Sequence, residues 1–189
     1  SNGSSGTGNA LNNVINGNSG NNVLSGLDGD DTLNGGDGND TLNGGAGHDT
    51  LDGGRGADTM SGGSGNDIYI VGEGDIVIEG LNPGTDEVRT DLDAYFLGAN
   101  VENLTYIGGT DFVGVGNSLN NVITGGDGND LLQGGAGNDT LHGGLGSDLM
   151  AGGAGDDIYY ADETTDVALE SAGGGTDVLA RLLARELGT

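Results

Sequence analysis

A nine-residue period runs through most of this chain, and each full copy reads GGxGxD followed by a variable residue, a large apolar residue and another variable residue. The copies from Gly35 read GGDGNDTLN, GGAGHDTLD, GGRGADTMS and GGSGNDIYI, and those from Gly125 read GGDGNDLLQ, GGAGNDTLH, GGLGSDLMA and GGAGDDIYY. One copy is too short to bury its own apolar residue, so the period predicts a solenoid of stacked repeats. The eighth-position residues, expected in the core, are Leu33, Leu42, Leu51, Met60, Tyr69, Leu132, Leu141, Met150 and Tyr159.

A larger duplication sets the length of one coil. One block opens at Gly8 (GNALNNVI) and ends with the tripeptide Asp-Ile-Tyr at Asp67, and a second opens at Gly116 (GNSLNNVI) and ends with the same tripeptide at Asp157. From opening to tripeptide, the second block is shorter by two nonapeptides, or 18 residues. Loss of one whole coil is the length change that a stacked solenoid tolerates without rotating everything after it. The sequence therefore predicts an all-β solenoid with 18 residues per coil.

Charge and residue type indicate which ligand such a stack binds. The net charge is −26, which disfavours nucleic acid and anionic membrane surfaces and attracts multivalent cations. Sixth-position aspartates two copies apart come within about one strand spacing, ~4.8 Å, where like charges repel unless a cation lies between them. Carboxylate and carbonyl oxygens, without Cys or His at the key positions, suit a hard ion, and a flexible site with many oxygens favours calcium over magnesium.

At this point the chain resembles the repeats-in-toxin (RTX) family, the glycine-rich calcium-binding repeats of secreted bacterial proteins, over about Gly8–Val71 and Gly116–Ala161. The resemblance implies a parallel β-roll in which calcium ions stack on both sides. Each ion lies between turns n and n+2, bound by two sixth-position aspartates and by backbone carbonyls of the first four loop residues. The well-formed pairs, about five sites, are Asp31/Asp49, Asp40/Asp58, Asp49/Asp67, Asp130/Asp148 and Asp139/Asp157; weaker pairs, raising the number to nine, are Asn22/Asp40, Asn13/Asp31, Asn121/Asp139 and Asp148/Asp166.

The same resemblance implies a full set of metal ligands, each carried over by its position in the repeat. In the first block these are Asp31, Gly35, Gly36, Asp37, Gly38, Asp40, Gly44, Gly45, Ala46, Gly47, Asp49, Gly53, Gly54, Arg55, Gly56, Asp58, Gly62, Gly63, Ser64, Gly65 and Asp67. In the second block they are Gly125, Gly126, Asp127, Gly128, Asp130, Gly134, Gly135, Ala136, Gly137, Asp139, Gly143, Gly144, Leu145, Gly146, Asp148, Gly152, Gly153, Ala154, Gly155 and Asp157.

The chain divides into four parts by repeat quality: residues 1–71 and 116–161 are repeat blocks, 72–115 is repeat-poor, and 162–189 is degenerate. We expect 72–115 to form metal-free coils or a cap, with a flexible linker as the alternative. Asp177–Leu187 has apolar residues at helical spacing. The resemblance implies type I secretion through an uncleaved C-terminal signal, and extracellular folding on calcium. The last part is then either some of that signal or the start of a truncated further block.

Other side chains receive structural interpretations. His48 and His142 occupy variable positions and are expected to be solvated spacers, Tyr69 and Tyr159 to close the core, and Arg55 to be exposed. The acidic residues at third and fifth positions, Asp28, Asp30, Asp37, Asp127 and Asp156, are interpreted as solvated charge.

The sequence therefore predicts a calcium-binding structural module and no enzyme, since no nucleophile elbow or HExxH motif occurs. It also contains no apolar run of the roughly 20 residues that a membrane helix needs. The alternative is a calcium-dependent carbohydrate- or surface-binding module of a secreted enzyme, such as an alginate epimerase, protease or lipase, or of an adhesin.

Overall fold

The computed structural model describes residues 3–81, 84–169 and 178–181, and each regular element in these ranges is a β-strand. The described ranges contain no helix that could span a membrane. The chain forms two compact units: Ser1–Thr90 with Gly98–Val101, and Asp91–Leu97 with Glu102–Thr189. The first unit holds β1 (Ser5–Thr7), β2 (Val14–Asn18), β3 (Val23–Asp28), β4 (Thr32–Asp37), β5 (Thr41–Ala46), β6 (Thr50–Arg55), β7 (Thr59–Ser64), β8 (Ile68–Val71), β9 (Ile76–Val77) and β10 (Glu87–Thr90).

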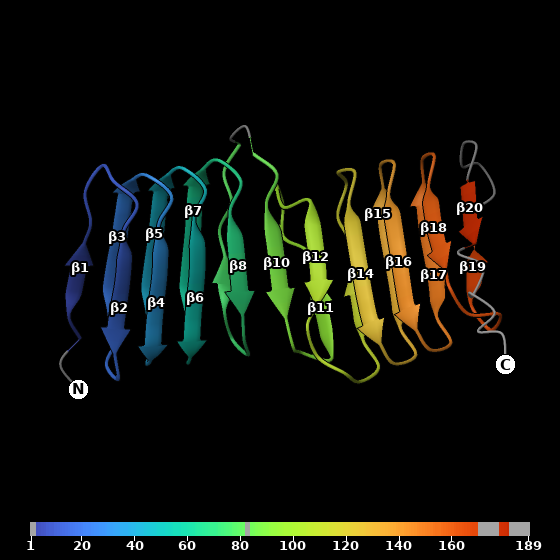
Figure 1. Ribbon diagram of the computed structural model, residues 1–189, viewed down its shortest axis with the longest axis horizontal. Coiled ribbons are helices and arrows are strands. Elements are labelled where there is room, and N and C mark those ends of the chain that lie inside the picture. Colours follow the sequence, from blue (N-terminus) through green and yellow to red (C-terminus); the bar gives the residue numbers. More distant parts are fainter. Residues whose placement is uncertain (1–2, 82–83, 170–177, 182–189) are drawn as a thin grey trace, which may run out of the picture. The chain divides into compact units, whose positions relative to one another are not determined.

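The second unit is built in the same way from ten further strands (Figure 1). These are β11 (Ala94–Phe96), β12 (Asn103–Tyr106), β13 (Val113–Val115), β14 (Val122–Asp127), β15 (Leu131–Ala136), β16 (Thr140–Leu145), β17 (Leu149–Ala154), β18 (Ile158–Ala161), β19 (Val167–Leu169) and β20 (Val178–Arg181).

Successive strands alternate between two parallel sheets in each unit. In the first unit, one sheet has the order β1-β3-β5-β7-β9 and the other contains β2-β4-β6-β8-β10; in the second unit, the orders are β11-β13-β15-β17-β19 and β12-β14-β16-β18-β20. A strand therefore pairs with the strand two elements later, and each coil contributes one strand to each sheet. This arrangement is a parallel β-roll, which confirms the predicted fold class.

The strand register gives the coil length directly. Within the repeat blocks Val23 pairs with Thr41, Thr41 with Thr59, and Leu131 with Leu149, and each partner lies two nonapeptides further along the chain. One coil therefore contains two nonapeptides, as the two block lengths predicted. Coils outside the motif depart slightly: Thr59 pairs with Ile76, and Ile68 with Glu87.

The core is a column of eighth-position side chains between the two sheets. Because strand residues alternate sides, the eighth residue points inward while the seventh and ninth point outward. Tyr69 and Tyr159, which are 0% and 2% exposed, end the column of each block, so their predicted role in the core is confirmed. The other column members are Leu24, Leu33, Leu42, Leu51, Met60, Ile123, Leu132, Leu141 and Met150, each at most 2% exposed.

The helical spacing of apolar residues in Asp177–Leu187 indicated a helix, but the described part of this segment is a strand. Val178–Arg181 forms strand β20, which pairs in parallel with β18. The four residues of this strand, VLAR, are too few to distinguish a helical period from a strand period, and pairing with β18 favours the strand. Asp177 and residues 182–187 lie outside the described residues.

Candidate metal centres

The loops between strands owe their shape to glycines at the second and fourth positions. In the loop that begins at Gly44, Gly45 has a φ of 121° and Gly47 a φ of 138°, a region that residues with a Cβ rarely enter. A Cβ on Gly45 would also strike the carbonyl oxygen of Leu27 one coil earlier. Leu27 itself occupies a second position with a φ of 86°, which marks its copy as imperfect. These turns bring the first glycine of each loop back beside the sixth-position aspartate.

One carboxylate oxygen of each sixth-position aspartate joins adjacent coils. The Oδ1 atom of Asp49, for example, accepts a hydrogen bond from the backbone N–H of Asp31 at 2.8 Å, and the same contact links Asp139 N–H to Asp157 Oδ1. The structure thus brings together the members of every predicted pair. The remaining contacts run from Asp40 to Asp58, Asp49 to Asp67, Asp130 to Asp148, Asn13 to Asp31, Asn22 to Asp40, Asn121 to Asp139 and Asp148 to Asp166.

The second carboxylate oxygen, Oδ2, is buried without a hydrogen-bond partner among the described residues. Buried polar atoms are almost always satisfied, so a repeated set of unsatisfied anionic oxygens indicates a partner other than protein. The side chains in question are no more than 2% exposed. They are Asp31, Asp40, Asp49, Asp58, Asp67, Asp130, Asp139 and Asp148.

The first glycine of the loop leaves a space at this oxygen. A Cβ on Gly44 would lie within 2.7 Å of both Asp49 Oδ2 and the carbonyl oxygen of Gly62, one coil later. Calcium–oxygen distances are about 2.3–2.6 Å, so a point near that Cβ position is within calcium range of both oxygens. We call such a point, between a sixth-position oxygen and the first-glycine carbonyl of the next coil, a cradle. The same cradle occurs at Gly26, Gly35, Gly125 and Gly134, and with Gly44 these correspond to the five well-formed pairs.

The degenerate copies differ from the five complete cradles in the oxygens that they offer. Asn22 offers a neutral Oδ1 that already accepts the N–H of Asn18 at 2.6 Å, and Asn13 and Asn121 are bonded in the same way. At Gly143, the three atoms nearest to the Cβ position all belong to Asp148. No glycine carbonyl is among them, so this cradle is incomplete.

The buried carboxylates are electrostatically unfavourable without a cation. Burial raises the pKa of Asp49 to about 6, and the charges of Asp67 and Asp31 add to the increase. Burial likewise raises the pKa of Asp58, Asp130 and Asp139 to about 6. The donor set consists of oxygen atoms, and the charges are uncompensated, so the residues present fit a hard divalent cation.

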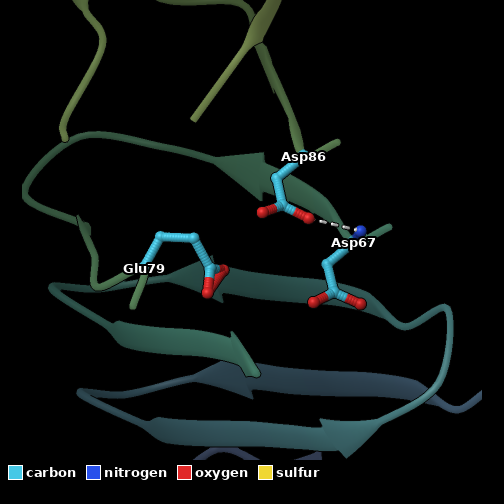
Figure 2. Close-up of side chains that lie close together, drawn as sticks. All are labelled: Asp67, Glu79 and Asp86. Carbon is cyan, nitrogen blue, oxygen red and sulfur yellow. Dashed lines mark hydrogen bonds between the residues drawn. The ribbon is translucent and has the colours of Figure 1, made fainter. Parts of the chain in front are cut away.

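Two clusters of three carboxylates contain residues that the sequence did not point to, namely Glu79, Asp86 and Asp162. Asp67, Glu79 and Asp86 each offer one oxygen within 4.8 Å of the other two, and so do Asp148, Asp162 and Asp166 (Figure 2 shows the first cluster). Two nonapeptides after Asp67, the chain has Thr85, and the aspartate follows one residue later as Asp86. A strict nine-residue period therefore does not detect it. The signal available was the duplication, because Asp75-Ile-Val-Ile-Glu and Asp166-Val-Ala-Leu-Glu match around these positions.

Fifth-position side chains also have a role that the sequence did not reveal. His48 and Asp30 are exposed, as expected, but Asp30 Oδ1 accepts the N–H of His48 at 2.9 Å, and His48 Nδ1 accepts the N–H of Asn66 at 2.9 Å. These bonds form a ladder along the outside of the loops, so the side chains are more than solvated spacers. His142 differs from expectation in another way, since it is half-buried and stacks on Tyr160 with ring centroids 4.2 Å apart.

A comparison with protein-family models identifies the repeats. The RTX calcium-binding nonapeptide repeat matches in four copies, at residues 7–42, 43–75, 115–150 and 137–168. The chain belongs to this family. It is a calcium-binding repeat module, and the RTX match covers the loops that form the five cradles. No curated protein matches the chain.

Proposed function

We propose that this RTX module is a structural unit of a secreted protein, which stays unfolded at low calcium and folds outside the cell when calcium binds. The observation that carries the proposal is the repeated set of buried aspartate Oδ2 atoms without hydrogen-bond partners among the described residues. A fold that buries these charges is disfavoured until a cation neutralises them. The concentration of calcium then decides whether the chain folds.

We infer that calcium occupies the five cradles at Gly26, Gly35, Gly44, Gly125 and Gly134. Each has an anionic oxygen and a glycine carbonyl from adjacent coils near one point, together with a second aspartate one coil later. Calcium supplies positive charge to these oxygens when bound. The aspartates hold the coils in register through their Oδ1 bonds, the glycines allow the close approach, and the eighth-position residues exclude water from one side. The loops with asparagine at the sixth position are weaker candidates.

Circular dichroism of the full chain during a calcium titration tests this function. The metal-free chain is expected to be largely disordered and to gain β signal with millimolar calcium, with a midpoint that magnesium does not reproduce. Magnesium retains its waters and requires a tighter octahedron than these backbone loops offer. A β-rich spectrum that excess chelator leaves unchanged would rule out calcium-driven folding.

The proposal assigns secretion to the type I route and no catalytic role to the chain. Folding controlled by calcium suits export of an unfolded chain from a cytosol poor in calcium. A calcium-dependent carbohydrate- or surface-binding role stays an alternative prediction. Binding to a glycan array in calcium, lost on chelation, would favour it.

A further inference from the structure

The first repeat block ends at a cluster of carboxylates that the nonapeptide motif does not contain. Asp67 is the last sixth-position aspartate of the block, whereas Glu79 and Asp86 lie beyond residue 75, where the family match ends. Asp67 and Asp86 are each 1% exposed, and Glu79 is half-buried. Figure 2 shows their three carboxylates around a common space, with the backbone N–H of Asp67 bonded to Asp86 Oδ1 at 2.8 Å.

An unsatisfied atom points to a ligand at this place. Asp67 Oδ2 is buried and has no hydrogen-bond partner among the described residues. It lies beside the Cβ position of Gly62, as in the five cradles, but the second oxygen there is the hydroxyl of Tyr69 rather than a glycine carbonyl. The coil that follows is one residue short, since Thr59 pairs with Ile76 and Met60 with Val77, and the same register puts Glu79 rather than a glycine opposite Gly62. The cradle at Gly62 therefore lacks the carbonyl that the motif supplies elsewhere.

Glu79 is bonded to the hydroxyl that stands in the place of that missing oxygen. Its Oε2 accepts the hydroxyl proton of Tyr69, whose own oxygen accepts the N–H of Gly62 at 2.6 Å. Its Oε1 accepts the N–H of Gly80 at 3.1 Å, and its backbone carbonyl accepts the side-chain amide of Asn100 at 3.0 Å. Both ends of Glu79 are thus fixed, and its carboxylate is held toward Asp67.

We propose that Asp67, Glu79 and Asp86 bind a calcium ion of their own, which closes the first repeat block. Three carboxylates around buried oxygens suit a hard divalent cation, and affinity for calcium rises with the number of charged ligands. Tyr69 is a positioning residue that orients Glu79. The same residue types recur in the second block as Asp157, Tyr159, Glu170 and Asp177, although Glu170 and Asp177 lie outside the described residues. This proposal rests on calcium binding by the module.

Counting bound calcium by native mass spectrometry on the full chain tests the proposal. Glu79→Gln is expected to bind one ion fewer than the unmodified chain at a calcium concentration that fills the remaining sites. Glu73→Gln, which removes an equal charge from an exposed position nearby, is expected to keep the full number. An unchanged count and unchanged affinities in Glu79→Gln would overturn the proposal. Absence of calcium binding by the unmodified chain would instead overturn the proposed function.

A second measurement reports from the site itself. The chain has no Trp, so tyrosine sensitises bound terbium, and Tyr69 is the tyrosine bonded to Glu79. Terbium emission excited through tyrosine should fall in Glu79→Gln and in Tyr69→Phe, but not in Tyr160→Phe, which alters a ninth-position ring stacked on His142. Equal emission from all variants would show that no ion lies beside Tyr69. If Glu79→Gln does not fold, Glu79→Asp keeps the charge but shortens its reach, and normal affinity at every site would equally refute the assignment.

Discussion

Replacing Gly44 by alanine would fill a cradle without straining the backbone. Gly44 has no left-handed φ, so alanine can adopt its conformation. The new methyl group would, however, lie 2.7 Å from the Gly62 carbonyl oxygen and closer still to Asp49 Oδ2. One of these oxygens must move, and either movement removes it from calcium range.

The expected loss follows from mass action. A site that binds only the folded chain contributes about 2.7 kcal/mol when calcium is at 100 times its dissociation constant. Gly44→Ala should therefore lose about 2.7 kcal/mol of calcium-dependent stability. The measurement is urea unfolding at fixed excess calcium, combined with the number of ions counted by calorimetry, which should fall by one.

Two control variants distinguish the loss of a calcium site from steric crowding by the new methyl group. Gly17→Ala places a methyl group against Asn22 Oδ1 and the Gly35 carbonyl, which is the same crowding at a neutral cradle. Gly109→Ala meets no atom within 4 Å and should change nothing. If Gly44→Ala loses no more calcium-dependent stability than Gly17→Ala and keeps its full calcium count, the cradle does not hold calcium.

Three further predictions follow from the coil geometry and the buried charges. Asp49→Ala should lose more bound calcium in calorimetry than Asp31→Ala, because Asp49 belongs to two well-formed pairs and Asp31 to one; equal losses would contradict binding between adjacent coils. Removing Gly44–Asp52 should lower hydrogen-exchange protection across Gly72–Val115 in saturating calcium, whereas removing Gly44–Ser61 should preserve it, because the strand register repeats every two nonapeptides; equal protection would refute the two-nonapeptide coil. Metal-stripped protein should gain β signal in circular dichroism as pH falls from 7 toward 4. The pKa of Asp49 is raised from 3.8 to about 6 in the fold, so between those values the metal-free fold binds more protons than the unfolded chain and loses stability as pH rises; a falling signal on acidification would be inconsistent with this.

The parts of the fold that depend on the repeat could be predicted from the sequence. Every full copy keeps Asp at the sixth position and a bulky residue at the eighth, and a period of two along a strand then fixes which side chains enter the core. The length of the coil also followed, because the second block is shorter than the first by two nonapeptides, and the observed strand register has the same length. Asp49 and Leu51 illustrate both assignments, with 1% and 0% exposure.

Features that depend on contacts between coils could not be predicted in the same way. Whether His48 Nδ1 meets a backbone N–H depends on how closely adjacent loops stack, which no local pattern records. Strand β11 at Ala94–Phe96 has no sequence signal of its own, because its three residues, AYF, are too few to show a strand period and lie outside the repeats. Glu79 and Asp86 were missed because one coil here is a residue shorter than two nonapeptides and another a residue longer, which changes their spacing in the sequence while preserving their position in space.

The ends of a repeat block pose a problem that its interior does not. Inside the block, the Oδ2 of a sixth-position aspartate lies near the first-glycine carbonyl of the next coil, two copies later, so the repeat itself supplies both oxygens. Asp67 is the last sixth-position aspartate of the first block and has no copy two positions later, so its buried Oδ2 would remain an uncompensated charge. In the first block Tyr69 replaces leucine at this point, reaching 0% exposure while its hydroxyl connects Gly62 to Glu79. The tyrosine thus extends the apolar column and carries a hydroxyl to the place where the next glycine carbonyl would lie, which explains why the first block ends in Asp-Ile-Tyr rather than in another leucine copy.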